Sequence, residues 1–203
     1  MTVNLVVMPA GPALVRELAP ADSVGEQLLA AVSTLVDAAL SADPARTVEL
    51  VGSRDPRWET GLTGSFAAWG APQVQVGAGT HLPELVQRYA LGGWTGRIAD
   101  TRANLQEIKP HALTVVAVDG SAGLTQRAPL ALIDAAAEAD EWCRDVLSGT
   151  RPGREMDPAS LRGAGVLEPD LWLELAALRP RRARLLAADT TLGVGRYVAA
   201  WEV

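Results

Sequence analysis

Two aspartates, Asp55 and Asp119, are the residues of this chain best suited by type and position to do chemistry. Each closely follows a short apolar run that is typical of a buried strand, and a serine stands nearby, Ser53 or Ser121. If both carboxylates project into one crevice, they could bind a cation or act as a general base, and their repulsion would raise one pKa. The alternative is structural: Asp119 caps a turn and Asp55 belongs to a loop.

The two histidines do not complete a metal site. A facial triad needs two His and one carboxylate, so it would require both His81 and His111. His81 stands two residues before Pro83, at an expected helix entrance, whereas His111 leads into a strand at its amino end. A crevice at the carboxyl ends of the strands lies away from His111, so we expect surface or capping roles for both.

Nucleophilic catalysis has little support in the sequence. Ser65 and Ser121 each follow a glycine but lack the complete Gly-x-Ser-x-Gly elbow. Cys143 is the single cysteine, so it cannot form an internal disulfide, and we interpret it as a packing residue in a reducing compartment. The glycine-rich stretches match neither the Walker A nor the dinucleotide-binding pattern.

Composition indicates one globular domain over residues 1–203, with 48% apolar and 21% charged residues. The net charge of −6 disfavours nucleic-acid binding. No run approaches the roughly 18 apolar residues of a membrane span, and residues 1–9 lack the features of a signal peptide. We therefore expect a cytoplasmic protein with no membrane or nucleic-acid partner, and the Ala- and Arg-rich composition suggests a bacterial genome rich in G and C. One basic cluster is expected on a solvated helix face: Arg179, Arg181, Arg182 and Arg184.

Apolar patterning predicts strands that alternate with helices. Strands are expected over residues 3–8, 47–51, 73–76, 113–118 and 193–203. Helices are expected behind a capping box of Ser23 and Glu26, from Pro83 towards Gly92, over 131–147, and from Pro158 and Pro169. The predicted fold class is α/β, a three-layer α/β/α single domain around a mostly parallel or mixed sheet, with 3–8, 47–51 and 113–118 adjacent.

Ligands of such sheets bind beyond the carboxyl ends of the strands, where loops converge. The segments that qualify are residues 9–12, 53–58 and 119–124. The residues expected to form the crevice are Pro9, Ala10, Ser53, Asp55, Asp119, Ser121 and Ala122.

These segments resemble motifs of the LigB-like superfamily, the class III extradiol ring-cleaving dioxygenases. Residues 9–18 read Pro-Ala-Gly-Pro-Ala-Leu-Val-Arg-Glu-Leu, similar to the family's Pro-His-Pro-Pro followed by Leu-Val-x-Glu-Leu. Residues 53–55 take the place of Ser-Pro-His. Residues 118–129 are similar to Gly-Asp-Leu-Ser-His-Arg-Leu-Thr-x-x-Ala-Pro, and residues 193–198 to Gly-Val-Gly-Tyr-x-Val. The four matches fall in the family's order.

The resemblance implies the fold and the crevice without the family's iron chemistry. Active members bind ferrous iron through two His and one Glu. Here the first His position is Ala10, the second is Asp55, the acid–base His position is Ala122, and the Glu position falls near Ala177. An alanine methyl can neither ligate a metal nor move a proton. We therefore expect no metal site and no cofactor.

Three functions remain open from the sequence. The first is a LigB-like protein that has lost ring cleavage and keeps a crevice for a small molecule or partner. The second is a metal-dependent enzyme, a dioxygenase or hydrolase, with altered ligands around Asp55 and Asp119. The third is an interaction protein in which exposed Trp and Leu side chains form a homo-oligomer interface.

Overall fold

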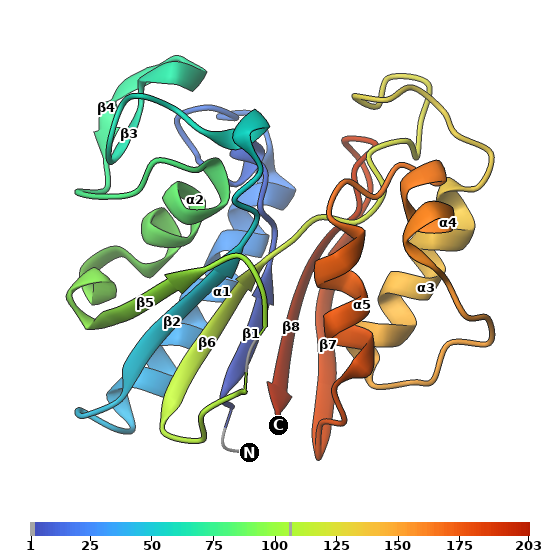
Figure 1. The fold of residues 1–203 in the computed structure, drawn as a ribbon. Helices are drawn as coiled ribbons and strands as arrows, with labels where there is room; N and C mark the ends of the chain where they lie inside the picture. The colour runs from blue at the N-terminus through green and yellow to red at the C-terminus, as the bar shows by residue number, and fades with distance from the viewer. Residues whose placement is uncertain (1–2, 106) are drawn as a thin grey trace.

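A computed structural model describes residues 3–105 and 107–203 (Figure 1). A six-stranded sheet of order β5-β2-β6-β1-β8-β7 forms its centre. Its strands are β1 (Leu5–Met8), β2 (Thr47–Gly52), β5 (Ile98–Arg102), β6 (Ala112–Ala117), β7 (Arg182–Asp189) and β8 (Arg196–Glu202).

The three strands predicted to be adjacent are adjacent in this sheet. β1 and β2 both pair with β6 in parallel, with Val6 opposite Val115 and Leu50 opposite the same residue. β5 extends the parallel part, whereas β8 is antiparallel to β1 and β7 is antiparallel to β8. The sheet is therefore mixed, and the predicted α/β class is confirmed.

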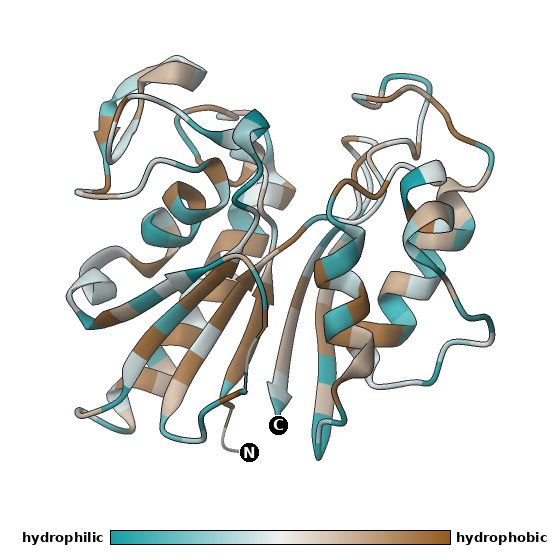
Figure 2. Cartoon of the chain, in the orientation of Figure 1, coloured by the Kyte–Doolittle hydropathy of each residue, from teal (hydrophilic) through white to brown (hydrophobic). Residues whose placement is uncertain are grey.

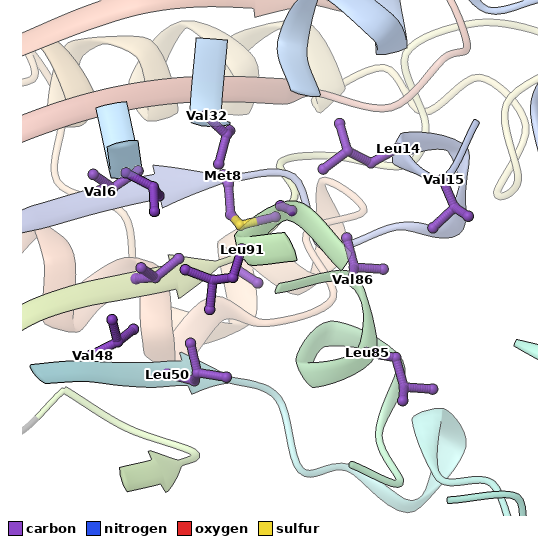
Figure 3. Close-up of a cluster of buried hydrophobic side chains, with 14 of the residues drawn as sticks. Val6, Met8, Leu14, Val15, Val32, Val48, Leu50, Leu85, Val86 and Leu91 are labelled. Carbon is purple, nitrogen blue, oxygen red and sulfur yellow. The ribbon is translucent and has the colours of Figure 1, made fainter. Parts of the chain in front are cut away.

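Helices cover the sheet on both faces (Figure 1). One layer contains α1 (Ser23–Ser41) and α2 (Leu82–Leu91); the other contains α3 (Ala136–Ser148), α4 (Pro158–Gly163) and α5 (Pro169–Ala177). Because successive strand side chains point to opposite faces, Val6 and Met8 pack under α1 while Leu5 and Val7 pack under α3 and α5. Figure 2 shows the resulting apolar central strands, and Figure 3 shows the cluster under α1 and α2.

Helix α1 begins where predicted, but its cap differs from the expected capping box. The carboxylate of Asp22 accepts a hydrogen bond from the backbone N–H of Gly25 at 2.9 Å. An aspartate at the N-cap satisfies a free helical N–H and favours the positive end of the helix dipole. Ser23 is instead the first helical residue.

By length and composition alone, α1 also meets the criteria for a membrane span, which the sequence analysis did not anticipate. In this fold it lies against the sheet, with Leu28, Val32, Val36 and Leu40 buried in the core. Core helices of globular proteins pass the same test, so this feature is weak support for a membrane association.

Helices α4 and α5 begin at Pro158 and Pro169, as predicted. Helix α3 starts at Ala136, later than the expected start at residue 131. Ala131 adopts a φ of 56°, which a right-handed helix does not accommodate. The helix ends at Gly149 with a φ of 75°, the usual C-terminal cap.

Two edge strands were not predicted. β5 and β7 carry charged residues among their apolar ones, and the arginine cluster expected on a helix face instead precedes and enters β7 at the sheet edge. Exposed charges on an edge strand oppose pairing with another chain.

The predicted strand at 73–76 lies outside the central sheet: β4 (Ala71–Gln75) pairs with the short β3 (Ser65–Phe66). The remaining elements are short 3-10 helices, η1 (Pro12–Leu14), η2 (Pro56–Trp58), η3 (Ala67–Trp69) and η4 (Gly92–Arg97).

Candidate functional site

A cavity of about 300 Å³ lies at the edge of the sheet where β1, β2 and β6 end. Since these three strands are parallel, the loops that follow them converge at one edge. β8 runs in the opposite direction, so its first residue, Arg196, reaches the same edge. Leu82 and Pro83 at the start of α2, and Leu167 and Glu168 at the start of α5, complete the walls.

The walls are largely apolar and consist mainly of Ala, Gly, Pro, Leu and Val residues. The other lining residues are Ser53, Trp58, Asp119, Glu168 and Arg196. An apolar concavity with a few convergent polar groups is the usual form of a small-molecule site, and the volume falls at the lower end of the roughly 300 to 1,000 Å³ common for such sites.

Asp119 is the most unusual polar group of the cavity. Its side chain is half-buried because part of it faces the cavity. The carboxylate Oδ1 accepts a hydrogen bond from the backbone N–H of Ala10 at 3.1 Å. Burial raises the pKa of Asp119 to about 6, against the lowering effects of the Ala10 N–H, the Arg196 charge and the Gly11 N–H.

The backbone of Asp119 is held from the opposite side. The indole Nε1 of the fully buried Trp172, on α5, donates a hydrogen bond to the carbonyl oxygen of Asp119 at 2.8 Å. Trp172 packs edge-to-face against Tyr197 of β8, with ring centroids 5.7 Å apart. The segment after β6 is therefore fixed between α5 and β8, and the Asp119 carboxyl has a defined position in the cavity.

Arg196 is buried, and two carboxylates other than Asp119 pair with its guanidinium. Its Nε donates to Asp189 Oδ2 at 2.9 Å, and its Nη1 forms an ion pair with Asp22, the cap of α1. Burial opposes the charged forms, but the paired hydrogen bonds dominate: they raise the pKa of Arg196 and lower the pKa of Asp22. The positive charge of Arg196, which lines the cavity, is therefore already balanced by the carboxylates of Asp22 and Asp189.

Trp58 and Glu168 connect η2 to the start of α5 across the cavity wall. The Trp58 indole Nε1 donates to Glu168 Oε1 at 3.0 Å, joining residues 110 positions apart in the chain. Ser53, at the end of β2, is buried, and its hydroxyl oxygen accepts a hydrogen bond from the backbone N–H of Asp55 at 3.2 Å. These contacts shape the wall, and the hydrogen bond of the Ser53 hydroxyl is to a backbone N–H rather than to a basic side chain.

Four of the residues predicted from the sequence line this one cavity: Ala10, Ser53, Asp119 and Ala122. They come from the loops after β1, β2 and β6, which the adjacency of those strands brings together. Ala10 and Ala122, the positions that the resemblance matches to two family histidines, thus share a cavity.

Three predicted residues do not line the cavity. Pro9 is buried and is not among the lining residues. Asp55 caps η2, and hydrogen bonds from the Arg57 side chain and backbone hold its pKa at about 2, so this carboxylate is engaged outside the cavity. Ser121 is fully buried, where its hydroxyl donates to the carbonyl of Ala164 at 2.6 Å and accepts from the N–H of Gly123.

The residues at these positions do not fit ferrous iron. Ala177 lies at the C-terminal end of α5 and lines a separate groove with Arg179 and Arg181. Within residues 3–105 and 107–203, no three His, Cys, Asp or Glu side chains come together as metal ligands. His111 precedes β6 at the opposite edge, and His81 caps α2 with its ring beside Arg54.

Sequence reasoning missed Glu168 and Arg196 as members of the site, and it did not single out Trp58 within its segment. Trp58 lies in the predicted crevice segment 53–58, but no other feature of the sequence distinguishes this tryptophan as a cavity residue. Glu168 directly precedes the helix-starting Pro169, which marks it as a residue at a helix N-terminus. Arg196 reaches the site because β8 is antiparallel, a property that local sequence does not reveal.

No protein-family model matches this chain, and no curated protein sequence matches it. The function therefore has to be inferred from the residues of the cavity.

Proposed function

We propose that this chain is a LigB-like protein that lacks ring-cleaving activity and uses the cavity at the sheet edge to bind a small molecule. The observation that carries the proposal is that Ala10 and Ala122 line one cavity with Asp119. The resemblance assigns an iron ligand to the first of these positions and the proton-transferring His to the second. With methyl groups there, the cavity retains an apolar binding volume and loses the ligands.

The cavity offers too few metal-binding side chains for an iron enzyme with altered ligands. A facial triad needs three protein ligands. Asp55 pairs with Arg57 and does not line the cavity. The carboxylates among the lining residues are those of Asp119 and Glu168, and Glu168 already accepts a hydrogen bond from the Trp58 indole. Ala122 also removes the proton shuttle of the family position, an effect worth roughly 10²- to 10⁴-fold in rate.

The first test combines metal analysis with a catechol assay. Protein purified without chelators should contain far less than stoichiometric iron and, after loading with ferrous iron, should form no yellow ring-fission product from protocatechuate. Asp55→Ala should change neither result. Stoichiometric iron, or product formation that Asp55→Ala abolishes, would replace the proposal by the metal-dependent enzyme with altered ligands.

The second test asks whether the cavity binds small molecules at all. Ala10→Phe places an aromatic ring in the cavity and should abolish the binding of fragments detected by ligand-observed NMR. Leu62→Phe is the matched control, because Leu62 is 49% exposed and lies outside the cavity. Fragment binding that survives Ala10→Phe, or that Leu62→Phe removes equally, would contradict a binding role for this cavity.

A further inference from the structure

We propose that the cavity selects ligands that combine an apolar, ring-sized body with one protonated amine, and that the Asp119 carboxylate pairs with the ammonium group. This inference rests on the proposed function, because it names the ligand class of the same cavity. It follows from where the charges of the cavity lie and which of them already have partners.

Within the described part of the chain Asp119 forms no ion pair, although the charge of Arg196 is close enough to lower its pKa. Its Oδ1 accepts the Ala10 N–H, and the backbone of Gly11 lies beside Oδ2, where a Cβ on that glycine would come within 3.1 Å. Among the residues that the structure describes, no Arg or Lys forms an ion pair with Asp119. A carboxylate that is enclosed by apolar walls and lacks an ionic partner gains strongly from a cation brought by a ligand.

Arg196 cannot serve as that partner. It also lines the cavity, but its guanidinium pairs with Asp22 and Asp189, which both lie behind it. The other lining carboxylate, Glu168, accepts the Trp58 indole N–H. Two carboxylates and one already paired cation thus face the cavity, so its electrostatic bias favours cationic ligands and disfavours carboxylates and phosphates.

The walls restrict what can accompany the cation. The cavity that Asp119 lines is also lined by apolar residues whose side chains offer no hydrogen bonds, among them Leu82, Pro83, Pro129 and Val194. A hydrated inorganic ion would leave these walls unused, whereas the apolar body of an organic amine would bury against them. The cavity volume of about 300 Å³ suits one ring and a short chain rather than a peptide or nucleotide.

Binding should depend on pH through Asp119. The charged groups that share the cavity are Arg196 on β8 and Glu168 at the start of α5, with Asp22 on α1 and Asp189 on β7 behind Arg196. With the Asp119 pKa at about 6, the carboxylate is charged at about pH 8 and mostly protonated at about pH 5. The amine remains protonated at both, so its affinity should fall about tenfold between them.

The experiment uses matched probes that differ only in charge. Benzylamine, 2-phenylethylamine and cyclohexylmethylamine are compared with their corresponding alcohols and with phenylacetate, by calorimetry and ligand-observed NMR on the full chain. At about pH 8 the best amine should bind about 10- to 100-fold more tightly than its alcohol, as expected for a charge-assisted hydrogen bond. Phenylacetate should bind no better than the alcohols.

Asp119→Asn keeps the acceptor for the Ala10 N–H and removes the charge, so it should abolish the preference for amines and leave the alcohols unaffected. Asp55→Asn, which removes a carboxylate outside the cavity, should retain the preference. If Asp119→Asn fails to fold, the loss of amine preference at about pH 5 in the unaltered chain tests the same point.

The outcomes separate this inference from the proposed function. Alcohols that bind as tightly as amines, or a preference that survives both Asp119→Asn and acid, would overturn the ammonium assignment while small-molecule binding stands. A preference for phenylacetate would also overturn it. Failure of every probe to bind at millimolar concentration would overturn both.

Discussion

The Asp119 carboxylate is placed where burial makes its charge unfavourable. It lies among apolar walls with backbone N–H groups beside it, it forms no ion pair with any residue that the structure describes, and its pKa rises to about 6. Polar groups that reduce the stability of the free protein are typical of binding sites, because the ligand supplies the missing interaction. The same residue should therefore be recognisable by its effect on stability in the absence of any ligand.

Asp119→Asn should stabilise the folded protein at neutral and alkaline pH. The folded-state pKa of about 6 lies above the ordinary value of 3.8, so between these values the folded state holds a proton that the unfolded chain has released. The unaltered protein therefore loses stability as the pH rises from about 4 to about 6, and the loss persists above that range. The amide avoids it, so urea unfolding at about pH 8 should show a gain of about 2 to 3 kcal/mol in the free energy of unfolding.

That gain should shrink as the pH falls through 3.8 and disappear below about pH 3, where Asp119 is protonated in both the folded and the unfolded state. Asp55→Asn provides a contrast of opposite sign, because Arg57 lowers the pKa of Asp55 to about 2. A gain from Asp119→Asn that is the same at both pH values would show that the carboxyl is not destabilised by its burial.

Arg196 connects three secondary-structure elements on one side of the cavity. It begins β8, pairs with Asp189 at the end of β7, and pairs with Asp22 at the cap of α1. Asp22 also accepts the N–H of Gly25, so one carboxylate both starts the helix and anchors it to the antiparallel part of the sheet. Loss of the arginine would leave two buried carboxylates facing each other without a cation.

Arg196→Met should therefore destabilise the protein by about 3 to 5 kcal/mol at about pH 7, as expected when one member of a buried ionic cluster is removed. The deficit should shrink below about pH 4: the paired Asp22 has a lowered pKa, so its contribution is present above the ordinary value of 3.8 and lost as the pH falls. Arg184→Met on the exposed face of β7 is the control, with an expected change within about 0.5 kcal/mol. Equal effects of both substitutions in urea unfolding would contradict a structural role for the cluster.

Across the molecule, burial decided what the sequence could predict. β1, β2 and β6 were predicted because they are buried and their sequences are mostly apolar, with Glu49 and Thr114 as buried exceptions. The edge strands β5 and β7 were missed because solvent permits charged residues along them. Helix starts followed their prolines at α4 and α5, whereas α3 starts after a turn at Ala131 whose positive φ has no sequence signature.

The same division holds for the cavity. Ala10, Ser53, Asp119 and Ala122 could be predicted together because they follow strands whose adjacency was predicted. Glu168 and Arg196 come from a helix start and an antiparallel strand, whose positions depend on how the C-terminal part packs rather than on local pattern. The sequence predicted Asp55 at the cavity because a strand ends before it, but its carboxylate forms an ion pair with the neighbouring Arg57 instead.

The position of β1 between β6 and β8 has a consequence for the route by which the chain folds. Leu5 pairs with Thr114 on one side and with Trp201 on the other, so the first strand described completes its hydrogen bonds only with the last. The entropy of closing such long loops is lost before the pairing gains anything, which slows folding relative to a chain whose contacts are local. During synthesis, one edge of β1 stays unpaired and the Asp22 carboxylate lacks Arg196 until β8 has left the ribosome. A partly made chain therefore exposes an apolar strand edge that chaperones would recognise.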